Sequence, residues 1–147
     1  MAYVANNYLT NTKAPMESWV CTRTSGLGPF TYPATPPIDT RHSPDFCGQC
    51  VSFATTVCPT LPVNTGHWSK GALAKGNTTL VAGTVIATFA DDGHYLGHTA
   101  IYHAQDNDGL VVFDQWITGH GKSIGRRTLR FGAQGVANDG DGFYVVE

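Results

Sequence analysis

Two cysteines, Cys47 and Cys50, lie three positions apart in the stretch DFCGQCVSF. A pair with this spacing can exchange electrons as a disulfide, supply half of a zinc site, or contain a nucleophile beside an unrelated neighbour. Each interpretation requires different partners elsewhere in the chain. The positions of the histidines and carboxylates therefore decide between them.

Cys50 falls at the start of a helix that the sequence predicts over residues 48–58. Apolar side chains at positions 50, 53, 54 and 57 give this helix one buried face, and Ser43 and Asp45 are candidate capping residues. A thiol in the first turn faces the positive end of the helix dipole, which favours the nucleophilic thiolate. Gly48 leaves room for a substrate backbone, and the amide of Cys50 can bind an oxyanion.

His98 is the candidate base for this thiolate. It opens a predicted strand in Gly-His-Thr-Ala-Ile-Tyr, and its imidazole can project at the sheet edge toward a helix packed on the sheet. Asp114 interrupts the apolar run VVFDQWI on the next strand, where an unpaired carboxylate would be costly to bury. It is therefore the candidate for orienting the imidazole, and Gln115 on the other face is the alternative.

The two halves of the chain differ in character, and together they predict one catalytic domain over residues 1–147. Residues 1–46 are rich in Pro, Thr, Ser and Gly and predict an irregular N-terminal wrap, followed by a helix and sheet over 47–147. Strand-like segments separated by Gly-containing turns follow the helix at 79–89, 98–105, 109–117, 122–131 and 142–147. This order predicts an α+β fold, with the helix packed on a four- to six-stranded antiparallel sheet.

Two other cysteine chemistries share the local signal. A redox pair at Cys47 and Cys50 requires a preceding strand in a βαβ unit, but TPPIDTRHSPDF cannot form a central strand. A zinc site could combine the two cysteines with His94 and His98, although their separation is long for a zinc finger. Both chemistries are kept as alternatives to the nucleophile.

A non-enzymatic alternative is a module that binds cell wall or carbohydrate through a surface of stacked aromatic rings. Its candidate residues are the tyrosines together with Trp19, Trp68 and Trp116. No aromatic repeat accompanies them, and most lie where a core requires large side chains.

Composition restricts the partners. The net charge is −2 with nine Lys and Arg residues, so we expect no nucleic-acid binding, and we interpret Gly-Arg-Arg at 125–127 as a solvated strand end. The N-terminus lacks the features of a classical signal peptide, and no apolar run reaches the length of a membrane-spanning helix. We expect a monomer without membrane insertion.

The motifs Gly48-Gln49-Cys50, GTVIATF, GHTAIY and VVFDQW resemble those of papain-like cysteine amidases and peptidases that cut peptidoglycan, the CHAP-type and NlpC-type hydrolases. The chain is most similar to small amidase effectors of type VI secretion, from about residue 45 to 131. The resemblance implies Cys50 as nucleophile, His98 as base and Asp114 as the third residue. It also implies hydrolysis of an amide bond in the stem peptide, without metal or cofactor.

Further expectations follow from this resemblance. An enzyme without a signal peptide must be secreted, or delivered to the periplasm of a target cell, by another route, and an immunity protein could block its cleft. Candidates for oxyanion or substrate contacts, beside Gly48, are Gln49, Tyr32 and Gln115. Cys21, Cys47 and Cys58 are extra cysteines, and a bridge Cys21–Cys47 or Cys21–Cys58 could tie the N-terminal wrap to the helix.

Overall fold

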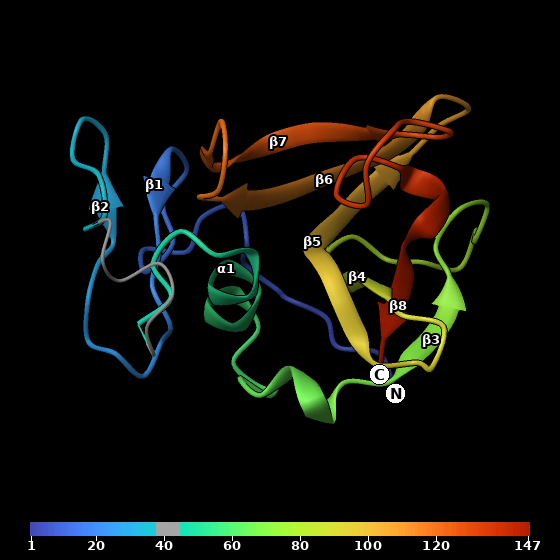
Figure 1. Ribbon diagram of the computed structural model, residues 1–147, viewed down its shortest axis with the longest axis horizontal. Helices are drawn as coiled ribbons and strands as arrows, with labels where there is room; N and C mark the ends of the chain where they lie inside the picture. Colours follow the sequence, from blue (N-terminus) through green and yellow to red (C-terminus); the bar gives the residue numbers. More distant parts are fainter. Residues whose placement is uncertain (38–44) are drawn as a thin grey trace.

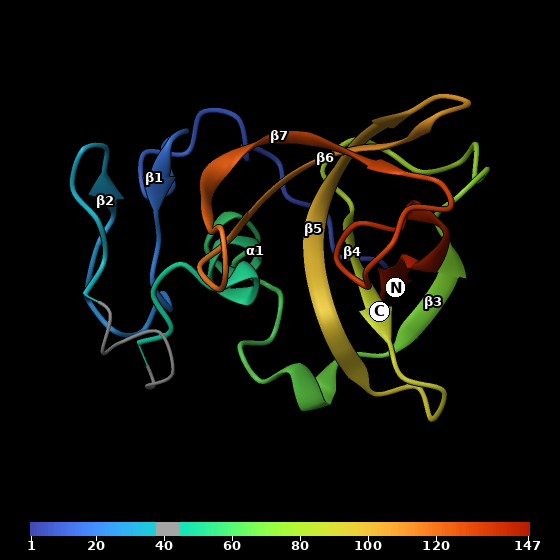
Figure 2. The ribbon, with the colours of Figure 1, turned by 45° about the horizontal axis from the view of Figure 1, so that its top comes forward.

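The computed structural model describes residues 1–37 and 45–147. Its main element is a six-stranded antiparallel sheet in the order β3-β8-β4-β5-β6-β7. The strands are β3 (Lys70–Leu73), β4 (Val85–Phe89), β5 (Tyr95–Gln105), β6 (Gly109–Trp116), β7 (Lys122–Arg130) and β8 (Tyr144–Val146). The sheet is strongly curved, so that β6 and β7 run at a steep angle to β3 and β8 (Figures 1 and 2).

One α-helix, α1 (Cys50–Val57), packs against β5 and β6. Two short strands, β1 (Ser18–Trp19) and β2 (Phe30–Thr31), pair with each other on the far side of the helix (Figure 1). The described residues also form the 3-10 helices η2 (Thr65–His67) and η3 (Gly140–Gly142). The predicted α+β class, with one helix on an antiparallel sheet, is confirmed.

The core has two parts, one on each face of the sheet. On the helix side, Phe53 and Val57 of α1 are buried against a cluster that includes Ile101 and Phe113. On the other side, Phe143 is fully buried in a cluster with Ala100, Tyr102 and further residues of β4, β6 and β7. Burying a Phe or Val side chain contributes about 1.5–3 kcal/mol, so the predicted apolar face of the helix fixes its position on the sheet.

Element boundaries differ from the sequence-based prediction for local reasons. The helix begins at Cys50 and not at residue 48, because Gly48 has a φ of +79° and Gln49 is the extended N-cap. The side chain of Gln49 makes no capping hydrogen bond, and Ser43 lies outside the described residues. The predicted strand 79–89 is shortened to β4, because Gly83 has a φ of +99° and lies against the carbonyl of Ala5.

Two further differences concern strands that pattern alone did not define. β3 forms in a segment whose residues predict turns, and its pairing with β8 stabilises it as a strand. β5 begins at Tyr95, three residues before His98, so this histidine lies inside the strand and not at its first residue.

Within the described residues, no helix has the length and apolar character needed to cross a bilayer.

Candidate active site

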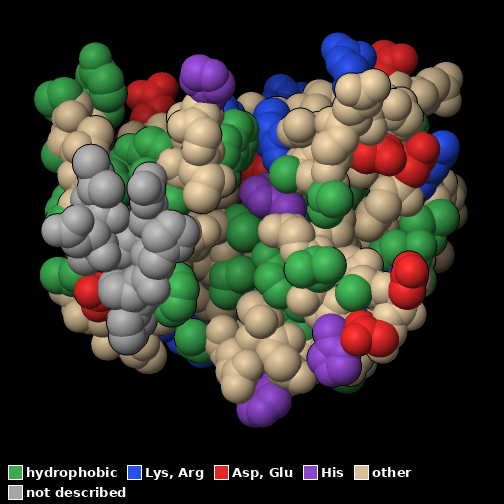
Figure 3. Space-filling view, viewed as in Figure 1, with side chains coloured by type: hydrophobic (Ala, Val, Ile, Leu, Met, Phe, Trp, Pro, Cys, Tyr) green, Lys and Arg blue, Asp and Glu red, His purple; other side chains and the backbone are tan. Residues whose placement is uncertain are grey.

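Cys50 is the first residue of α1, and its thiol is free. The residue is 9% exposed and lines a cleft of about 720 Å³ together with Gln49, Ser52 and Tyr95. Hydrophobic side chains gather in the middle of the face shown in Figure 3. Because Cys50 is only 9% exposed and lines the cleft, its side chain is enclosed on most sides but lies at the wall of an open cleft.

The chain segment that leads into α1 is held by Gln115 of β6. Its amide nitrogen donates to the carbonyls of Val20 and Gln49, and its amide oxygen accepts from the amide of Val20. The amide of Gly48 also donates to the Val20 carbonyl. This network joins the N-terminal segment, the helix start and the sheet, and so it fixes where the Cys50 thiol lies.

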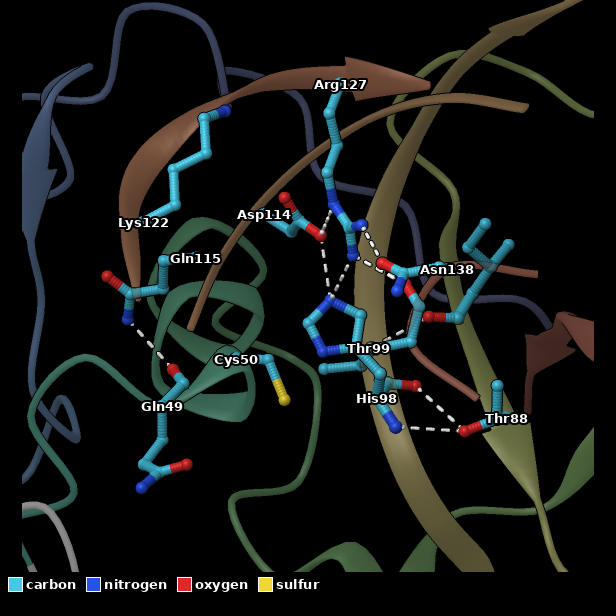
Figure 4. A network of polar contacts seen from close by, with 12 residues as sticks. Gln49, Cys50, Thr88, His98, Thr99, Asp114, Gln115, Lys122, Arg127 and Asn138 are labelled. Carbon is cyan, nitrogen blue, oxygen red and sulfur yellow. Dashed lines mark hydrogen bonds and ion pairs between the residues drawn. The ribbon is translucent and has the colours of Figure 1, made fainter. Parts of the chain in front are cut away.

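His98 and Asp114 lie on one face of the adjacent strands β5 and β6. The register Ile101↔Phe113 places them diagonally across the pair, within reach of long side chains. His98 Nε2 lies 2.7 Å from Asp114 Oδ2, and both side chains are almost fully buried. Because an ionised carboxylate only accepts, Nε2 carries a proton, and Nδ1 remains on the side of the ring that faces Cys50 (Figure 4).

Three groups converge on the Cys50 sulfur. The His98 ring and the backbone amide of Thr99 are close enough to lower the pKa of the thiol, and the hydroxyl of Tyr95 lies 3.4 Å from the sulfur. The amides of His98 and Tyr102 bond toward β4, so the intervening Thr99 amide points to the opposite edge of β5. The sulfur therefore lies at the edge of β5 that faces β6.

These surroundings shift the pKa values of the Cys50 thiol and the His98 imidazole. Burial raises the pKa of the Cys50 thiol, but the hydrogen bond and charge of His98, with those of Tyr95 and Thr99, bring the pKa below its ordinary value. Burial also opposes the charged form of His98, yet the hydrogen bonds to Asp114 and Cys50 raise its pKa to about 9. Both shifts favour a thiolate–imidazolium pair.

Arg127 of β7 is a site residue that sequence reasoning missed. Its Nε donates to Asp114 Oδ2 at 2.8 Å, and another of its nitrogens donates to Asn138 (Figure 4). Its remaining nitrogen donates to the Ala137 carbonyl, and the guanidinium stacks on Trp116 at 4.6 Å from the ring centroid. Nη2 lies 3.3 Å from His98 Nε2, but both are donors, so they share the carboxylate and do not bond to each other. The interpretation as a solvated strand end is wrong for Arg127, which is buried over most of its side chain.

The candidates for substrate contacts are distributed differently from the expectation. Gln49 lines the cleft beside Cys50, as predicted from its position. The other three candidates are not among the described residues that line this cleft. Gly48 lies against Ile117, and a Cβ at position 48 would approach the Ile117 side chain to 2.8 Å. Gln115 is fully buried and bonds to backbone groups. Tyr32 is 80% exposed and lies beside Glu17 and Lys122, outside the cleft lining.

The cysteine pairing resolves the three interpretations of the Cys47–Cys50 spacing. Cys47 forms a disulfide with Cys21, while Cys58 is free and buried. The alternatives of a Cys47–Cys50 redox pair, a zinc site that uses both cysteines and a Cys21–Cys58 bridge are therefore wrong. Consistent with this, His94 is exposed and pairs with Asp92, away from the sulfur.

The three tryptophans do not form a common stacking surface. Trp68 is 4% exposed and packs in the core, and Trp116 is covered by the guanidinium of Arg127. Trp19 is half-buried in the β1–β2 ladder. The tryptophans therefore give the aromatic-surface alternative no shared platform.

A free cysteine at the start of a helix, a histidine and an aspartate on neighbouring strands, and an antiparallel sheet beneath them define a cysteine hydrolase with a papain-like arrangement. Residues 39–146 match the model of the family described as domesticated amidase effector 2. The chain belongs to this family. The predicted similarity to amidase effectors is confirmed, while the relation to the CHAP-type and NlpC-type groups stays a prediction.

Individual relatives agree with this membership. A domesticated amidase effector 2 from Ixodes scapularis is 39% identical over 103 residues, which cover 67% of this chain and 70% of that protein. A type VI secretion amidase effector 2 protein from Salmonella typhi is 32% identical over 96 residues, which cover 54% and 71%. A solved structure of a type 6 secretion amidase effector 2 superposes with a TM-score of 0.59 at 29% identity, covering 67% of this chain and 80% of that one.

Proposed function

We propose that this protein is a cysteine amidase that hydrolyses an amide bond in the stem peptide of peptidoglycan. The observation that carries the proposal is the free Cys50 thiol at the helix start, which lies beside the imidazole of His98, itself paired with Asp114. Membership in an amidase effector family supports the same reaction class. No step of this chemistry requires a metal or cofactor.

In the proposed mechanism the Cys50 thiolate attacks the amide carbonyl while His98 holds the proton. The backbone amide of Cys50 binds the developing oxyanion, and His98 then transfers its proton to the leaving nitrogen as the C–N bond breaks. Water, deprotonated by the same imidazole, releases the acyl group from the sulfur. Asp114 keeps Nε2 protonated, so that Nδ1 always faces the sulfur.

The test of this function is digestion of purified peptidoglycan followed by mass spectrometry of the soluble products. An amidase releases fragments whose mass increases by one water at a stem-peptide bond. A cell-wall-binding module would sediment with the peptidoglycan and release nothing, and that result would refute the proposed activity. The product masses also identify which amide is cut.

The pH dependence follows from the two pKa shifts. Because the pKa of His98 is raised to about 9, we expect kcat/KM to fall as the pH rises through about 9, where the imidazolium loses the proton needed by the leaving group. On the acid side, the lowered pKa of Cys50 keeps the thiolate at pH values where an ordinary cysteine is protonated. A pH profile with its alkaline limb near 6.5, the ordinary histidine value, would contradict the arrangement.

We also propose that the protein acts as an antibacterial effector. The relative from Salmonella typhi is a type VI secretion effector by name, which supports delivery into a target cell, with the periplasm as the site of action. A monomer with an open cleft is a suitable target for an immunity protein that blocks Cys50. Export of the wild-type chain to the periplasm of a bacterium should lyse the cells, and harmless accumulation of folded protein would contradict this role.

A further inference from the structure

Among the described residues that line the cleft, Tyr95 is the one whose side-chain hydroxyl touches the thiol, and the mechanism above does not use it. Its Oη lies 3.4 Å from Cys50 Sγ, and Tyr95 lines the same cleft. We propose that Tyr95 is a catalytic residue, whose hydroxyl hydrogen-bonds to the resting thiolate and then to the oxyanion formed on the attacked carbonyl. This proposal rests on the proposed amidase function and adds a second donor to the Cys50 amide.

The ring of Tyr95 is fixed by its surroundings. It packs against the helix-side core and meets the ring of Trp68 edge-on, with 4.9 Å between the centroids. Trp68 is itself held, because its indole nitrogen donates to the carbonyl of Pro62. A hydroxyl on a ring held in this way is preorganised, which is the property that makes a donor effective in stabilising developing charge.

Tyr95 and His98 approach the same sulfur from opposite faces of the sheet, and a local irregularity of β5 lies between them. Tyr95 packs in the helix-side cluster, whereas the His98 ring contacts Phe143 of the other cluster. Between the pairs Phe89↔Tyr95 and Ala87↔Thr99, β5 contains two more residues than β4. The sulfur lies at the strand edge between the two rings, so both can reach it.

The irregularity is built from Thr88 and Gly97. The Thr88 hydroxyl donates to the Leu96 carbonyl and accepts from the His98 amide, which bridges the extra residues. Gly97 has a φ of +111°, and a Cβ there would lie 2.5 Å from side-chain atoms of Thr88 and Val136. Bulges of this kind often occur next to active sites, and this one lies between Tyr95 and His98.

The phenol stays protonated throughout the reaction. Burial, together with the adjacent negative charge of Cys50, raises the pKa of Tyr95 far above its ordinary value, so the hydroxyl remains a donor at every pH at which the enzyme works. Tyr95 therefore supplies a hydrogen bond and not a proton.

The step balances without any further reactant. The sulfur forms the C–S bond, and the electron pair of the carbonyl π bond moves to the oxygen. The negative charge thus moves from the sulfur to the carbonyl oxygen, which is two bonds away. A hydroxyl that already contacts the sulfur can shift its hydrogen bond to this oxygen. Tyr95 keeps its proton, and the proton held by His98 goes to the leaving nitrogen when the C–N bond breaks.

The test compares Tyr95→Phe with the wild type and with Tyr144→Phe as the matched control. Tyr144 is a half-buried tyrosine of β8 outside the cleft lining, so its variant loses a hydroxyl without touching the site. Phenylalanine keeps the ring contact of Tyr95 with Trp68. We expect Tyr95→Phe to reduce kcat on peptidoglycan by about 10²–10³-fold, the usual cost of losing one oxyanion donor, and Tyr144→Phe to leave it unchanged.

Two measurements separate the oxyanion role from a role in thiol acidity alone. The pH dependence of iodoacetamide alkylation gives the pKa of the Cys50 thiol in each variant, and the loss in kcat should persist at pH values where the Tyr95→Phe thiol is fully ionised. Recovery of wild-type kcat at such pH values would overturn the proposal. So would a Tyr95→Phe variant as active as the control at all pH values.

The acylation burst with p-nitrophenyl acetate keeps this result independent of the natural substrate. A wild-type burst without any digestion of peptidoglycan would refute the proposed substrate, while the role of Tyr95 could still be measured on the ester. A reduced burst rate in Tyr95→Phe supports the second donor. A burst rate unchanged from the wild type, with the thiol ionised, overturns it.

Discussion

Cys50→Ala is expected to abolish release of stem-peptide fragments from peptidoglycan, with a rate loss of about 10⁴-fold or more, as for loss of the nucleophile in other hydrolases. The sulfur is the atom on which His98, Tyr95 and the Thr99 amide converge, and alanine offers nothing in its place. The side chain is small and lies at the wall of a cleft, so its loss should leave folding intact. Time courses of product release by mass spectrometry, with thermal unfolding in parallel, give both quantities.

Cys58→Ala is the matched control for this prediction. Cys58 is the other free cysteine, it is 1% exposed, and its sulfur lies 3.6 Å from the Thr60 hydroxyl. We expect this variant to retain activity, and iodoacetamide should label Cys50 and not Cys58 in the folded wild type at neutral pH. Normal cleavage by Cys50→Ala, or preferential labelling of Cys58, would be incompatible with the proposed nucleophile.

Asp114→Ala is expected to lower both stability and activity. The carboxylate is fully buried and accepts from His98 Nε2 and Arg127 Nε, so its removal leaves a largely buried guanidinium without its ionic partner. Breaking a buried ion pair from one side costs about 3–5 kcal/mol of unfolding free energy. The imidazole also loses the acceptor that fixes its tautomer, so kcat should fall as well. Urea denaturation and peptidoglycan digestion measure the two effects.

Asp114→Asn separates the geometry of this contact from its charge. The Oδ1 atom of Asp114 makes no hydrogen bond within the described residues, so an asparagine can keep its carbonyl oxygen at the Oδ2 position and still accept from both partners. We expect it to unfold at a higher urea concentration than Asp114→Ala. Without the negative charge, the alkaline limb of activity should move to a lower pH than in the wild type. Equal stability of the two variants would show that the hydrogen bonds contribute little.

The sequence identified those parts of the site whose signal is local. Cys50 at a helix start, His98 within GHTAIY and Asp114 in an apolar run are each visible from residue type and periodicity, and so was the α+β order of helix and strands. The resemblance to amidase effectors extended these observations to a reaction class, and the family match agrees with it. The roles of the individual residues stay proposals that the variants above can test.

The parts that sequence reasoning missed depend on contacts between distant segments. Arg127 lies in a charged pair of residues typical of a solvated strand end, and the register of β6 with β7 makes it a diagonal neighbour of Asp114 on the adjacent strand. Tyr95 follows a turn, and two extra residues, bridged by the Thr88 hydroxyl, separate it from the regular part of β5; its contact with Cys50 is 45 positions away in the sequence. Gln115 has the periodicity of a helix-facing residue, but nothing in its neighbourhood shows that its partners are backbone atoms of residues 20 and 49.

The burial of the Cys21–Cys47 bond has a practical consequence for handling the protein. Cys21 is 3% exposed and Cys47 is fully buried, so a small thiol reaches their sulfurs only when the chain opens around them. Mild reductant in a storage buffer will thus protect the free thiol of Cys50 from oxidation, while the Cys21–Cys47 disulfide stays intact. In urea the same reductant will reduce the disulfide. Refolding then begins from a chain without this bond, so recovery of activity should require an oxidant.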